Sequence, residues 1–72
     1  MRRGFINYFD LNKNYGYIIG YDNELYYFEF SSLNFPLNYL TKNLDVLFVA
    51  RQNDMMLYAL NINLDKDNDL LK

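Results

Sequence analysis

Residues 15–30 read YGYIIGYDNELYYFEF and carry the strongest structural signal in the chain. Two short runs of aromatic and β-branched residues, at 15–20 and 24–30, are separated by the polar sequence Tyr21-Asp22-Asn23. Such runs favour extended backbone, and Asp and Asn are typical of tight turns. The stretch therefore predicts a β-hairpin.

Three further extended segments flank this hairpin. We expect strands at residues 3–10, 45–51 and 57–64, with polar turns at 11–14 and 52–54. The connection between the third and fourth strands contains a candidate helical turn at 31–33 and Pro36, which breaks regular structure. A helix over 54–64 is the alternative to the last strand, and the sequence Asn61-Ile62-Asn63 argues against it.

Short strands separated by polar turns, without a clear helical repeat, predict an all-β protein. With five strands we expect a small antiparallel β-barrel, because closure removes exposed sheet edges. A chain of 72 residues forms one domain, with the barrel over 1–64 and a solvated charged tail, DKDNDLLK, over 65–72. The expected core residues are Ile6, Ile18, Tyr26, Phe28, Val46, Phe48 and Ile62.

Composition excludes several classes of function. The chain has no cysteine and no histidine, which excludes disulfides and thiolate zinc ligation and removes the usual general base. The carboxylates show no metal-loop or paired-acid spacing, so we expect no metal, no cofactor and no enzyme activity. No apolar run approaches the roughly 18 residues of a membrane span, and none follows Arg2-Arg3 as in a signal peptide. We therefore expect a cytoplasmic protein.

Aromatic residues are unusually frequent, with eight tyrosines and six phenylalanines. A core this small cannot enclose them all, and an exposed aromatic patch is typical of a binding surface. Strand alternation sends Tyr15 and Tyr17 to one side of the second strand, and Tyr27 and Glu29 to one side of the third. Stacking on such rings binds unpaired bases with little positive charge, whereas a net charge of −2 argues against a long duplex footprint.

Five segments also resemble the motifs of one known family. GFINYFD (4–10) is similar to Gly-x-Val-Lys-Trp-Phe-Asn, KNYGYI (13–18) to Lys-Gly-Phe/Tyr-Gly-Phe-Ile, and YYFEFS (26–31) to Val-Phe-Val-His-Phe-Ser. Residues 40–48 and 59–62 match the patterns Leu-x-x-Gly-x-x-Val-x-Phe and Ala-x-Asn-Val. In this order and spacing, over residues 4 to about 64, the chain resembles the bacterial cold-shock domain family.

The resemblance implies an oligonucleotide-binding (OB) barrel that binds single-stranded RNA or DNA, commonly as an RNA chaperone. It implies base stacking by five rings, which are Tyr8, Tyr15, Tyr17, Tyr27 and Phe30, with Phe9 partly beneath them. It also implies a phosphate or base contact from Lys13 and a further ring, Phe35, from the long loop. Glu29 stands in the same face, at the family's histidine position. The implied nucleic-acid-binding residues are Tyr8, Phe9, Lys13, Tyr15, Tyr17, Tyr27, Glu29, Phe30 and Phe35.

The departures from the family pattern lead to further expectations. Asn14 and Asn43 replace glycines, and asparagine is the residue that best replaces glycine at positive φ. Asn7 replaces a lysine and Glu29 a histidine, which should weaken binding to phosphates. Glu29 could instead accept a hydrogen bond from a base amino group.

Two alternatives remain at this stage. The tyrosine face could bind a partner protein on a barrel that has lost nucleic-acid binding, since tyrosine also suits protein interfaces and the chain is acidic. The tyrosines could also form cross-strand pairs that only stabilise the sheet. We expect a monomer, with a strand-exchanged dimer as the alternative if the long loop is strained.

Overall fold

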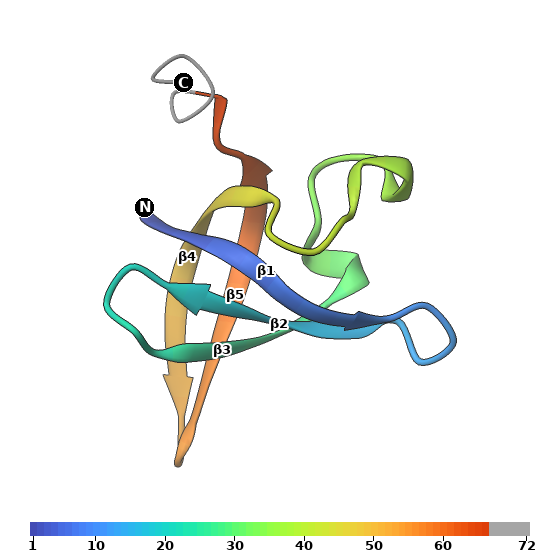
Figure 1. Ribbon diagram of the computed structural model, residues 1–72. Coiled ribbons are helices and arrows are strands. Elements are labelled where there is room, and N and C mark those ends of the chain that lie inside the picture. The colour runs from blue at the N-terminus through green and yellow to red at the C-terminus, as the bar shows by residue number, and fades with distance from the viewer. Residues whose placement is uncertain (67–72) are drawn as a thin grey trace.

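The structure, a computed structural model, describes residues 1–66, which form a closed five-stranded β-barrel (Figure 1). The elements are β1 (Arg2–Asp10), β2 (Tyr15–Gly20), β3 (Leu25–Glu29), the 3₁₀ turns η1 (Phe30–Ser32) and η2 (Leu37–Tyr39), β4 (Asp45–Asn53) and β5 (Met56–Leu64).

The strands follow the order β1-β2-β3-β5-β4 around the barrel, and β4 returns to pair with β1. This confirms the all-β barrel. The helix alternative for 54–64 is wrong, because most of that segment is a strand.

The pairing of β3 with β5 is parallel, whereas the other four ladders of the barrel are antiparallel. A purely antiparallel barrel was expected, and that part of the prediction is wrong for a geometric reason. Strand directions that alternate around a closed ring of five strands must repeat once. The repeat falls at β3 and β5, where Tyr27 lies opposite Tyr58.

The β4–β5 turn lies slightly later than expected. Strand β4 continues to Asn53, which pairs with Met56, so the turn consists of Asp54 and Met55 rather than 52–54. Asp54 has φ 53°, and Asp is one of the residues that enter this left-handed region. The resulting hairpin projects beyond the other strands (Figure 1).

The barrel interior contains all seven residues that the sequence assigned to it, each at most 2% exposed. Leu40 from the long connection and Ala59 from β5 complete this core. Tyr26 and Phe48 lie edge to face, with ring centroids 4.9 Å apart. The period-two alternation of strand residues therefore identified the buried face correctly.

Two irregularities interrupt this alternation. In β1, Ile6 pairs with Ile18 but Tyr8 pairs with Tyr17, so Asn7 is an extra residue, a β-bulge. The bulge moves Tyr8, which simple alternation from Ile6 would turn inward, to the outer surface. A second register shift separates the β4–β5 pairs on either side of Asn61, which has φ 50°.

The two asparagines at family glycine positions have the backbone conformation expected of them. Asn14 has φ 60° and Asn43 has φ 72°. The Asn14 N–H donates to the Asp10 carbonyl at 2.8 Å, and the Asn43 N–H donates to the Ile6 carbonyl at 2.7 Å. Asparagine therefore closes both turns without glycine.

Asp65 is not a solvated residue of the tail, contrary to expectation. Its side chain is fully buried, with Oδ2 3.5 Å from Arg3 Nε, and its N–H donates to the Asp45 carbonyl at 3.1 Å. An ion pair and a backbone hydrogen bond thus extend the barrel past residue 64, and Lys66 is exposed. Residues 67–72 of the expected tail lie outside the described residues.

The β2–β3 turn contains a hydrogen bond that should make stability depend on pH. The Tyr26 hydroxyl donates to Asp22 Oδ2 at 2.6 Å, and this bond holds the pKa of Asp22 below its ordinary value. A lowered folded-state pKa stabilises the fold above the unfolded value of about 4, and this stabilisation is lost as pH falls through the folded value. Tyr26→Phe should therefore lower the free energy of unfolding by about 1 kcal/mol at neutral pH, and by less in acid.

Urea unfolding of the wild type and the variant at a series of pH values measures this difference. Tyr39→Phe, in the exposed η2 turn, is the matched control and should leave stability unchanged. A Tyr26→Phe difference that stayed constant down to strongly acidic pH would show that the Asp22 charge does not contribute.

Candidate functional site

Four tyrosine rings gather on the outer surface of strands β1, β2 and β3. Each ring has at least two of the others as neighbours, with centroid distances between 5.9 and 6.4 Å. Most of the pairs are tilted or edge to face, and Tyr15 and Tyr27 are nearly parallel, at 28°. We call this group the tyrosine face; it consists of Tyr8, Tyr15, Tyr17 and Tyr27.

Strand register explains why these rings meet. Tyr8 pairs with Tyr17, and Tyr17 pairs with Tyr27, so three tyrosines form one row across neighbouring strands. Directly paired residues point to the same side of a sheet, and their side chains touch. Tyr15 lies two residues before Tyr17 on the same side, where it pairs with Glu29. The Asn7 bulge supplies the first member of the row.

The rings of the tyrosine face are partly open to solvent. Tyr8 is 45% exposed, and the other three are half-buried against one another. Partial burial raises the pKa of Tyr15, with a smaller contribution from the Tyr8 hydroxyl. Burial, followed by the Glu29 charge, also raises the pKa of Tyr27. A raised pKa keeps the Tyr15 and Tyr27 rings uncharged at neutral pH, so they can stack on a base without repelling its phosphate.

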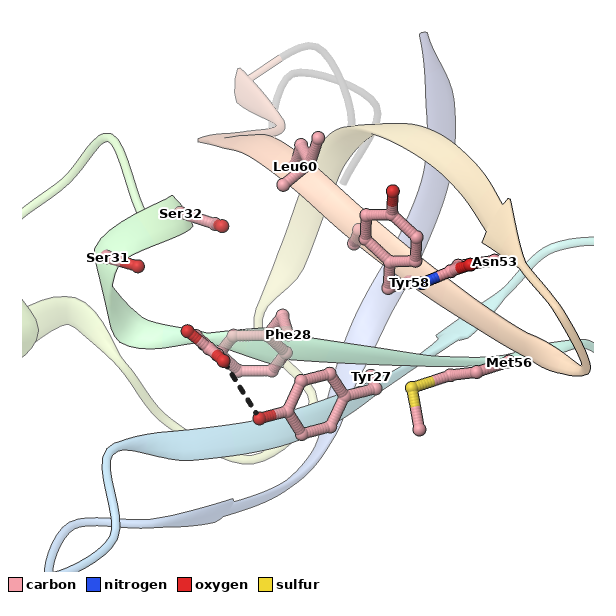
Figure 2. A pocket seen from close by; sticks show the side chains of 10 residues that line it. Tyr27, Phe28, Ser31, Ser32, Asn53, Met56, Tyr58 and Leu60 are labelled. Carbon is pink, nitrogen blue, oxygen red and sulfur yellow. Dashed lines mark hydrogen bonds between the residues drawn. The ribbon is translucent and has the colours of Figure 1, made fainter.

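One cation and one carboxylate border the tyrosine face. A hollow of about 410 Å³ lies beside Tyr27 and is lined by Lys13, Glu29, Phe30 and neighbouring residues. The Tyr27 hydroxyl donates to Glu29 Oε1 at 3.3 Å, which keeps the carboxylate next to the rings (Figure 2). Lys13 lies in the β1–β2 turn, where its backbone N–H donates to Asp10 Oδ1 at 3.1 Å.

The three phenylalanines implied by the resemblance lie in different places. Phe9 is half-buried against the core, as expected for a residue beneath the face. Phe30 is also half-buried and stacks on Phe28 with centroids 6.2 Å apart, so much of its ring is used for packing. Phe35 lines a separate hollow of about 610 Å³ with Leu44 and Leu64. The structure therefore brings together four of the five expected stacking rings; the fifth, Phe30, packs on Phe28, and the additional loop ring, Phe35, lies apart from them.

Sequence reasoning overlooked Tyr58. It pairs with Tyr27 across the parallel β3–β5 junction and lines a hollow with it (Figure 2). Alternation counted back from Ile62, the expected core residue of this strand, would turn Tyr58 inward. The register shift at Asn61 instead places it outside, next to the buried Ala59. Without the strand order, nothing in the sequence connects Tyr58 to Tyr27.

Within residues 1–66, no three carboxylates come together as a metal-ligand group, and no helix has the length and hydropathy to cross a membrane. No family model matches the chain, and no curated protein matches it.

Proposed function

We propose that this protein binds single-stranded RNA or DNA by stacking bases on the tyrosine face, as an RNA chaperone of the cold-shock type. It acts in the cytoplasm, without covalent chemistry and without a cofactor. The observation that carries the proposal is the convergence of four partly exposed rings on one outer surface of an OB-like barrel. Each base stacked on an aromatic ring contributes about 1–3 kcal/mol, so a few contacts give useful affinity.

The charges around the face favour unpaired strands over duplexes. Lys13 is the cation that lines the hollow next to Tyr27, and Glu29 places a negative charge in the same hollow. Neutralisation of few phosphates gives a weak dependence on salt. Stacking needs bases that are not already paired, so a protein of this design would hold RNA in its unpaired form.

Removal of one ring from the centre of the row tests the proposal. Tyr17→Ala and Tyr27→Ala should each weaken binding of a pyrimidine-rich single strand by about 1–3 kcal/mol, because each removes one stacking surface. Tyr39→Ala is the matched control: its ring is 52% exposed in η2, outside the face, and its removal should not change affinity. Quenching of tyrosine fluorescence during titration with the oligonucleotide at low salt measures the affinities.

A wild-type protein that leaves the signal unchanged at micromolar oligonucleotide would refute the proposal. The tyrosine face would then be read as a surface for a partner protein, which its carboxylate and the net charge of −2 would suit. Circular dichroism of each variant separates a loss of stacking from a loss of fold.

A further inference from the structure

The row of tyrosines does not end at β3. Register carries it from Tyr8 through Tyr17 and Tyr27 to Tyr58, and the next partner of Tyr58, on β4, is Arg51. Tyr58 lies on the outer side because Ala59 points into the core, and Arg51 is exposed. One line of paired residues therefore crosses all five strands and ends with a guanidinium group.

The β3 and β5 segments separate from each other because they have different numbers of residues between their two pairing points. The two segments pair at Tyr27–Tyr58 and meet again at the isolated bridge Leu33–Ile62. The segment from Tyr27 to Leu33 is six residue steps long, whereas the β5 segment from Tyr58 to Ile62 has four. The η1 turn accommodates the two extra residues. The segments diverge between the bridges, which leaves a groove of about 360 Å³.

The groove has both apolar and polar walls, which suit a planar heterocyclic ring with polar groups along its edge. Figure 2 shows Tyr27 and Phe28 on one side, Tyr58 and Leu60 on the other, and Ser31 and Ser32 at one end. Apolar surfaces accept the faces of a heterocycle, whereas hydroxyl groups can bond its edge. The volume lies at the lower end of the range for small-molecule pockets.

We propose that this groove binds one additional base of the same strand, stacked on Tyr58, with its phosphate bound by Arg51. This inference rests on the proposed function and extends it to a defined subsite. The continuity of the row supports the same strand as the occupant, since a strand that follows Tyr8, Tyr17 and Tyr27 reaches Tyr58 next. Arg51 supplies positive charge at that end, and its guanidinium has five N–H donors, one of which is used on the Ala50 carbonyl.

A comparison of strand lengths tests the subsite. Oligothymidylates that lengthen by one nucleotide at a time are titrated against the wild type, Tyr58→Ala, Tyr58→Phe and Tyr17→Ala. Tyr58→Ala should leave the shortest bound strand unaffected and weaken longer strands about 5- to 150-fold, the equivalent of one lost stack. Tyr58→Phe keeps the ring and should retain wild-type affinity, whereas Tyr17→Ala should weaken strands of every length.

The position of the extra base provides a second readout. A photoreactive iodouracil placed at each position in turn should cross-link to the β5 segment around Tyr58 only from one end of the strand. Equal affinities of Tyr58→Ala and the wild type at every length, with Tyr17→Ala still weakened, would overturn the subsite and leave the proposed function intact. Absence of binding by the wild type would refute both.

Discussion

Phe48→Ala is expected to lower the free energy of unfolding by about 3–5 kcal/mol, the usual loss for a large aromatic residue removed from a core. Phe48 is fully buried and forms the edge-to-face contact with Tyr26. The total stability of a 72-residue domain is about 4–11 kcal/mol. The substitution should therefore remove a large share of the stability and move the unfolding midpoint to a much lower urea concentration.

Urea unfolding monitored by circular dichroism measures this loss. Leu37→Ala is the matched control, because that side chain is half exposed in η2 and its truncation should change stability by less than about 0.5 kcal/mol. Equal midpoints for the two variants would show that the barrel interior is not the main source of stability.

Gly16→Ala should cost about 3 kcal/mol or more, although it adds a single methyl group. A Cβ at this position would overlap the Tyr8 carbonyl oxygen and would lie 2.7 Å from the Phe28 ring. Neither neighbour can move freely, because one is backbone in a paired strand and the other is a fully buried ring. Overpacking of a core costs about 1–3 kcal/mol, and contact with backbone places this case at the upper end.

Gly20→Ala provides the comparison for this effect. Its Cβ would meet chiefly the Asp22 carboxylate and an edge of Tyr26 at 3.0 Å. The carboxylate can rotate away at the cost of the hydrogen bonds that it accepts from Tyr26 and Glu24, about 1 kcal/mol each. We expect a smaller loss of stability, measured by the same urea unfolding. If the Gly20 variant were the less stable of the two, the close approach of Tyr8 and Phe28 would not be the reason for glycine at position 16.

Local sequence was sufficient to predict much of the barrel. Alternation in 15–30 predicted the β2–β3 hairpin and its inward residues, because a strand with one buried face must repeat every second residue. Alternation could not predict the parallel β3–β5 pairing, which follows from closure of the ring, nor the burial of Asp65, which depends on Arg3 from the other end of the chain. Both are contacts between segments far apart in sequence.

In the candidate site too, residues on adjacent strands could be predicted from local sequence, whereas contacts between distant segments could not. Tyr15, Tyr17 and Tyr27 could be placed on one surface from adjacent strands alone, and the structure brings their rings together. Phe30 was expected on that surface, but the η1 turn lays it against Phe28. Tyr58 could not be recognised, because its neighbour in space is 31 positions away, at Tyr27.

The bulge at Asn7 makes the outer surface of β1 tolerant of one particular change in length. Because side chains alternate, loss of the Asn7 codon would leave Ile6 inward and Tyr8, then its immediate neighbour, still outward. Phe9 would keep its inward side as well. A single-codon deletion at this point should therefore preserve the phenol on the surface, whereas a deletion elsewhere in a paired strand would turn the following side chains to the opposite face.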